Sequence, residues 1–74
     1  MPEVTLEGRP VQGDIIGKYI AVQLSPSSRA WDIKVQRESF EYVLSAIFAL
    51  DLSRKTRICH IKRGRIVDVV RSWN

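Results

Sequence analysis

The sequence has too few cysteines and histidines for a disulfide or a metal centre. Its 74 residues include one cysteine, Cys59, and one histidine, His60. A lone thiol cannot form an internal disulfide, and no pair of these residues has the spacing of zinc ligands. The two are neighbours in an alternating segment, where adjacent side chains point to opposite faces, so they cannot act as a nucleophile and its base. We expect no metal and no cofactor.

Other catalytic patterns are missing as well. The four glycines are scattered singly and match neither a phosphate-binding loop nor a dinucleotide fingerprint. Glu38 and Glu41 lie one helical turn apart, a spacing typical of the solvated stripe of a helix. The expectation is a protein that is not an enzyme.

The sequence also lacks a long apolar run. The longest nearly apolar stretch, Tyr42 to Leu50, is far too short to span a bilayer. The first ten residues show neither the basic nor the apolar part of a secretory signal. Together with the lone thiol, this pattern predicts a cytoplasmic protein with no membrane partner.

What is present indicates one small α+β domain covering residues 1–74. A single core of this size gives only about 3–5 kcal/mol of net stability. Small domains without disulfides or metals often associate, so a homodimer is expected.

Period-two alternation predicts two hairpins. Residues 18–37 hold two alternating runs around a Ser- and Pro-rich loop, and they form the clearest hairpin. Residues 56–73 hold two more runs around Arg63-Gly64, a pair suited to a two-residue turn. With that turn, His60 would face Val67 and Ile58 would face Val69. Residues 1–17 are predicted to be an edge hairpin or arm, broken by Gly8 and Pro10.

Residues 38–52 are predicted to form the helix, because their apolar residues recur with a period of 3.6. Ser39 is its expected N-cap, with Glu41 in the first turn. Tyr42 and Phe48 widen the apolar side beyond what one sheet face would cover. Both faces of the last hairpin are also partly apolar, through Ile61 and Ile66 on its second face. These four residues are the predicted oligomer interface.

The resulting fold class is α+β, an antiparallel β-sheet carrying one helix in the order ββαββ, with a possible extra N-terminal hairpin. The hairpin of residues 18–37 would offer the helix one apolar face. The predicted core is Ile20, Val22, Leu24, Trp31, Ile33, Val35, Phe40, Val43, Leu44, Ile47, Ile58, Val67 and Val69.

Charge is distributed unevenly along the chain. Residues 1–50 carry five basic and six acidic side chains, whereas residues 51–74 carry seven basic and two acidic ones. A basic hairpin can follow phosphates, and aromatic residues such as Trp73 or Tyr19 could stack on bases. The predicted binding residues are Arg54, Lys55, Arg57, Lys62, Arg63, Arg65, Arg71 and Trp73.

Nucleic-acid binding, to DNA or RNA, is therefore the leading functional hypothesis. The same basic residues would also suit docking to an acidic protein surface, as in a viral or regulatory inhibitor or an interaction module. Service as a subunit of a larger assembly is a third hypothesis. Basic hairpin turns also arise simply for solubility and to prevent edge pairing.

Overall fold

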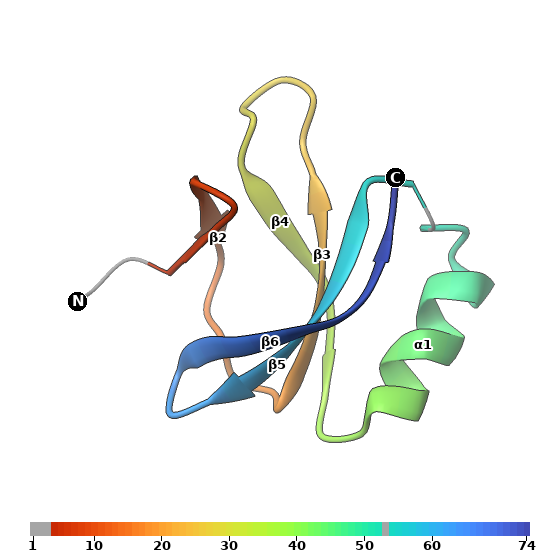
Figure 1. The fold of residues 1–74 in the computed structure, drawn as a ribbon. Helices are drawn as coiled ribbons and strands as arrows, with labels where there is room; N and C mark the ends of the chain where they lie inside the picture. The colour runs from red at the N-terminus through yellow and green to blue at the C-terminus, as the bar shows by residue number, and fades with distance from the viewer. Residues whose placement is uncertain (1–3, 53) are drawn as a thin grey trace.

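Three hairpins of alternating sequence associate into one sheet, and a single helix packs against it (Figure 1). The computed structural model describes residues 4–52 and 54–74. In this part of the chain there are six strands and one helix: β1 (Thr5–Leu6), β2 (Arg9–Gln12), β3 (Tyr19–Leu24), β4 (Trp31–Arg37), α1 (Phe40–Ala49), β5 (Thr56–Lys62) and β6 (Arg65–Trp73). The α+β class is confirmed, and the sheet is nearly closed into a barrel.

The sheet is mixed, which corrects the expected antiparallel arrangement. Its strand order is β1-β2-β4-β3-β5-β6, and the pair β2–β4 is parallel. Strand β3 lies between β4 and β5, so the other edge of β4 is free, and β2 pairs with it. Residues 5–12 are part of the sheet as the β1–β2 hairpin, the additional hairpin expected beside the order ββαββ, while residues 1–3 lie outside the described part of the chain.

A bulge in β4 places its apolar residues on two faces. Ala21 pairs with Val35 and Val22 with Ile33, so Lys34 is an extra residue without a partner. One extra residue moves every later side chain to the opposite face. Trp31 and Ile33 therefore pack on one side of the sheet and Val35 on the other, although strict alternation predicted a common face for all three.

Each face of the sheet has its own apolar cluster. One contains Ile20, Val22 and Trp31 with Leu6 and Val11 of the N-terminal hairpin, as well as Cys59 and Ile61. The other contains Ala21, Val35 and Ile58 packed against Val43 and Ile47 of α1. The helix thus covers the face opposite to the one predicted, because the N-terminal hairpin already occupies the Ile20–Val22 face.

Helix α1 is shorter than the predicted 38–52 segment. Ser39 occupies the N-cap position with extended backbone, but its side chain makes no capping hydrogen bond. Glu41 lies in the first turn, as predicted. Val43 and Ile47 form the buried stripe, and the Phe40 ring lies edge-on to Tyr19 with ring centroids 6.0 Å apart.

The last hairpin closes through Arg63 and Gly64, which both have positive φ as a primed two-residue turn requires. Lys62 faces Arg65 and Ile61 faces Ile66, as predicted. Beyond them, bulges at Val67 and Val70 shift the register, so His60 faces Asp68 and Ile58 faces Arg71. The predicted pairs of His60 with Val67 and Ile58 with Val69 are therefore wrong.

Strand β6 is an edge strand, and this corrects the predicted core. Val67 is 53% exposed and Val69 is also exposed, because β6 is the last strand in the sheet order and has a neighbouring strand on one side only. The other eleven predicted core residues are buried or partly buried. No helix among residues 4–52 and 54–74 has the length and apolar character needed to cross a membrane.

Candidate nucleic-acid interface

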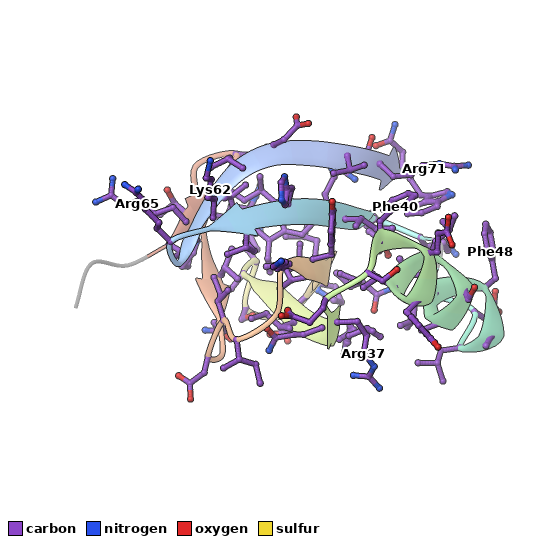
Figure 2. All side chains as sticks on the ribbon, turned by 90° about the horizontal axis from the view of Figure 1, so that it is seen from below. Arg37, Phe40, Phe48, Lys62, Arg65 and Arg71 are labelled. Atoms are coloured by element: carbon purple, nitrogen blue, oxygen red, sulfur yellow. The ribbon has the colours of Figure 1, made fainter. Side chains whose placement is uncertain are left out.

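The predicted binding residues separate into two groups at opposite ends of the last hairpin. At about 3.3 Å per residue, the seven residues of β5 span roughly 20 Å. Lys62, Arg63 and Arg65 lie at the turn, whereas Arg54, Lys55, Arg71 and Trp73 lie at the other end. Figure 2 shows Lys62 and Arg65 at the end away from α1, and Arg71 beside the helix. The basic residues thus do not form one continuous ribbon.

Arg57 belongs to neither group, because its guanidinium is used within the fold. Its Nε donates to Glu7 at 3.0 Å, and its Nη1 donates to the backbone oxygen of Trp73 at 2.9 Å. The guanidinium also lies over the Trp31 ring, 5.2 Å from the centroid. This side chain joins the N-terminal hairpin to the C-terminus and is not free to contact a phosphate.

Trp73 is likewise part of the fold. Its ring is edge-on to Phe48 of α1, with centroids 6.1 Å apart, and Arg71 lies 5.3 Å from its centroid. It packs against the cluster beneath the helix. A base could not stack on Trp73 without displacing one of these neighbours.

The turn end of the hairpin combines exposed cations with an aromatic surface. Lys62 and Arg65 are opposite each other in register and therefore share a face of the sheet. His60 lies two residues from Lys62 on that face, and Tyr19 of β3 is its register partner. The Tyr19 and His60 rings are stacked, with centroids 4.8 Å apart and an interplanar angle of 11°. Both rings are partly exposed.

Asp68 is the acidic neighbour of this surface. It is exposed and lies across from His60 in the register of β5 and β6. A carboxylate at this position would repel a phosphate, so phosphates would be favoured near Lys62 and Arg65 rather than over the rings. The charge pattern therefore separates a phosphate position from a base position.

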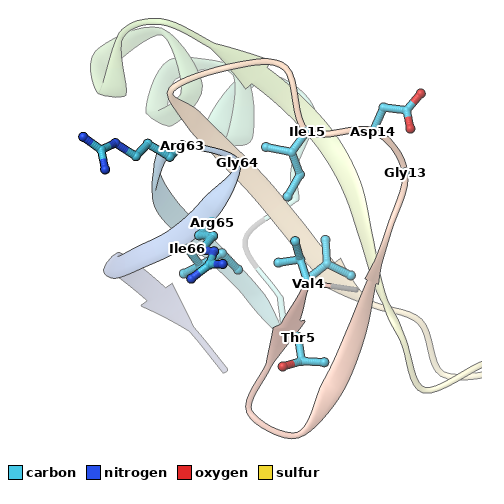
Figure 3. Close-up of a pocket in the computed structure, with 10 residues that line it drawn as sticks. Val4, Thr5, Gly13, Asp14, Ile15, Arg63, Gly64, Arg65 and Ile66 are labelled. Atoms are coloured by element: carbon cyan, nitrogen blue, oxygen red, sulfur yellow. The ribbon is translucent and has the colours of Figure 1, made fainter. Parts of the chain in front are cut away.

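A groove of about 780 Å³ lies beside the turn, between β6 and the N-terminal hairpin (Figure 3). Arg63 and Arg65 line one side, Asp14 lines the other, and Val4, Val11, Ile15 and Ile66 are among the apolar lining residues. Because its rim carries charges of both signs, this groove is a poorer match for a polyanion than the face with Lys62 and His60.

Cys59 is buried in the cluster beneath the N-terminal hairpin. Burial raises the pKa of its thiol to about 11, against an ordinary value of 9.0. A thiol that stays protonated at neutral pH is a poor nucleophile and metal ligand. Within residues 4–52 and 54–74, no three His, Cys, Asp or Glu residues lie close enough together to hold a metal ion.

The four predicted interface residues have different environments. Tyr42 and Phe48 are exposed on α1, on different flanks of the helix, because they are six residues and thus about 120° apart around its axis. Ile61 is only 7% exposed, and Ile66 packs against the same cluster. The latter two residues are therefore used in the core of their own chain.

Sequence reasoning did not identify His60 as part of a stacked surface. Its position depends on the pairing of β3 with β5, strands separated by β4 and the helix along the chain. No local pattern specifies that pairing. A comparison of the chain with models of protein families, with curated proteins and with solved structures finds no match.

Proposed function

We propose that this protein is a non-enzymatic nucleic-acid binding protein that contacts a single strand through the turn end of its last hairpin. Lys62, Arg63 and Arg65 would neutralise phosphates, and the Tyr19–His60 stack would support a base. Single-stranded binding proteins commonly combine a cationic surface with aromatic side chains on which bases stack.

The observation that carries this proposal is the register that brings Tyr19, His60 and Lys62 onto one face. The distance along a strand from His60 to Lys62 is about 6.6 Å, since residues on one face are two positions apart. A base can therefore contact the Tyr19–His60 rings while a neighbouring phosphate contacts the cations. This is the face on which α1 packs, and Lys62 and Arg65 lie at the end of it away from the helix.

The test is a titration of a fluorescent single-stranded oligonucleotide of mixed sequence, followed by anisotropy at low salt. Neutralising three phosphates gives a slope of roughly −2 for the logarithm of affinity against the logarithm of salt concentration. Lys62→Gln with Arg65→Gln should weaken binding at least tenfold on any sequence, because phosphate contacts carry no sequence information. Absence of binding by the unmodified protein at low salt contradicts the proposal.

A matched control removes the same charge from the other end of the hairpin. Arg54→Gln with Lys55→Gln should weaken binding much less than the change at the turn. His60→Ala should weaken it by about 1–3 kcal/mol if a base stacks there, whereas Tyr19→Phe keeps a ring and should have little effect. Equal losses from both double variants would indicate attraction by net charge alone.

The alternative function is docking to an acidic protein surface, as an interaction module, an inhibitor or a subunit of an assembly. Its supporting observation is the exposed edge strand β6, which presents Val67, Val69 and Val70 together with Arg65 and Arg71. An extended segment of a partner could add to such an edge. Val67→Lys would disrupt that docking and leave nucleic-acid affinity unchanged or raised.

A further inference from the structure

The stack of Tyr19 and His60 can be extended by a further ring on one side only. Tyr19 pairs with Arg37 of β4 and with His60 of β5. Phe40, three residues after Arg37, meets the Tyr19 ring edge-on, so Tyr19 has an aromatic neighbour on both sides. Tyr19 covers the face of the imidazole that is turned toward β3. The other face of the His60 ring is turned toward β6, the next strand in the sheet order.

Asp68 is the residue of β6 that lies beside this face of the imidazole. It is opposite His60 in register, because the extra Val67 shifts the strand by one residue. Side chains stand roughly perpendicular to a sheet, and facing residues on two strands are about 4.5–5.5 Å apart. An aspartate side chain is shorter than a histidine side chain, so its carboxylate lies beside the lower part of the ring. A base stacked on His60 would thus have one edge toward the Asp68 carboxylate.

The Asp68 carboxylate is available for a contact with a base. Asp68 is exposed, and the one ion pair within residues 4–52 and 54–74 joins Arg57 to Glu7. An ionised aspartate is an acceptor only, and its two oxygens can accept two parallel hydrogen bonds. The group at this position therefore selects bases by the donors that they present.

The bases differ in how well their edges suit a carboxylate. Guanine presents two adjacent donors, the N1–H and the N2 amino group, which match the two carboxylate oxygens. Cytosine and adenine present an amino group beside a ring-nitrogen acceptor, and thymine or uracil presents one N–H between two carbonyl oxygens. An acceptor beside the donor would face the carboxylate and repel it. Guanine is thus the base that can form two charge-assisted hydrogen bonds without this repulsion.

We propose that Asp68 gives the single-stranded site a preference for guanine at the base stacked on His60. This inference rests on the proposed nucleic-acid function and names the base that the site selects. Lys62, Arg63 and Arg65 hold phosphates without reading the sequence, and the His60 ring accepts any base. Selection then depends on one acidic side chain, whose charge also lowers the affinity for every strand.

The test is fluorescence anisotropy with oligothymidine of about five nucleotides, in which the central base is varied. A strand this short limits the number of registers in which it can bind. Guanine at the centre should raise the affinity at least about fivefold over thymine, the lower end of what a bidentate base contact contributes. Hypoxanthine lacks the N2 amino group and should lose most of this gain. The base 7-deazaguanine keeps both donors and should retain it.

Asp68→Asn separates base recognition from repulsion. The amide keeps one acceptor oxygen and loses the charge, so the guanine preference should largely disappear while the affinity for every strand rises. Asp14→Asn is the matched control, because it removes the same charge from the groove that Arg63 and Arg65 line. This control should leave the ratio of guanine to thymine affinity unchanged. Both aspartates are exposed, and circular dichroism should show that both variants fold.

Equal affinity for all central bases overturns this inference and leaves the proposed binding site in place. A guanine preference that persists in Asp68→Asn also overturns it, because another group would then read the base. A stronger preference for cytosine or adenine contradicts the two-bond contact with guanine. Absence of binding to every oligonucleotide at low salt overturns the proposed function, and the base preference with it.

Discussion

Arg57 connects three parts of the chain through one guanidinium. It pairs with Glu7 of the β1–β2 turn, donates to the backbone at Trp73, and lies over Trp31. Its side chain is 14% exposed, against 53% for Glu7. A residue predicted to bind a partner is thus one of the links that close the sheet toward a barrel.

Arg57→Lys should lower the free energy of unfolding by about 1.5–3 kcal/mol, because a lysine cannot reproduce the hydrogen bonds of the guanidinium. Urea denaturation measures this change. Glu7→Gln is the control and should cost less than about 1 kcal/mol, since an exposed ion pair contributes little. If Arg57→Lys and Glu7→Gln lower the free energy of unfolding by equally small amounts, the guanidinium does not hold these segments together.

The buried Cys59 thiol should make the free energy of unfolding depend on pH. Burial raises the pKa of its thiol from 9.0 to about 11, so the folded protein holds this proton more tightly than the unfolded chain. The thiol therefore contributes stability below pH 9 that is lost as pH rises from about 9 to about 11. Stability should fall over this window in the unmodified protein and fall less in Cys59→Ala.

The same burial should protect the thiol from alkylation. Iodoacetamide should modify Cys59 at a rate set by unfolding, and urea should accelerate the reaction strongly. Fast alkylation of the folded protein at neutral pH would show that the thiol is accessible, contrary to its buried position.

At the scale of elements, the bulges decide which residues are available for function. The extra Lys34 turns Val35 toward α1, and Lys34 lines a groove between β4 and the helix. The extra Val67 brings Asp68 opposite His60, and the extra Val70 brings Arg71 opposite Ile58. No particular residue type marks the bulges in these strands. Strict alternation therefore could not predict which face of the sheet the side chains beyond each bulge occupy.

The buried and the exposed apolar residues of the helix segment should contribute differently to the free energy of unfolding. Ile47→Ala should cost about 2–5 kcal/mol of unfolding free energy, since Ile47 is fully buried and leaves a cavity. Leu50→Ala should cost less than about 1 kcal/mol under dilute conditions, where its exposed side chain faces water. Thermal or urea unfolding of both variants at low micromolar protein makes the comparison.

At the scale of the whole molecule, local patterns were enough for the main elements and not for their assembly. Alternation located the strands of both long hairpins, and the 3.6-residue period located α1. The turn at Arg63-Gly64 also followed from its residue types. These features depend only on residues close in sequence.

Long-range pairing could not be predicted in the same way. The parallel pairing of β2 with β4 places Val11 beside Trp31, twenty residues further along the chain. Glycine and proline residues in and near β2 also obscure the alternation of that strand. That contact places the N-terminal hairpin over Ile20 and Val22 and so moves the helix to the other face. The Tyr19–His60 stack depends on an equally distant pairing, which is why the candidate site was only partly predicted.

We propose above that a nucleic-acid strand binds the sheet face at the turn of the last hairpin. The most direct measurement is an NMR titration of isotope-labelled protein with a single-stranded oligonucleotide, observing backbone amide signals. We expect the shifts to concentrate at residues 60–65 and at Tyr19, with little change in residues 41–49 of α1. Shifts confined to α1, or no shifts at low salt, would contradict it.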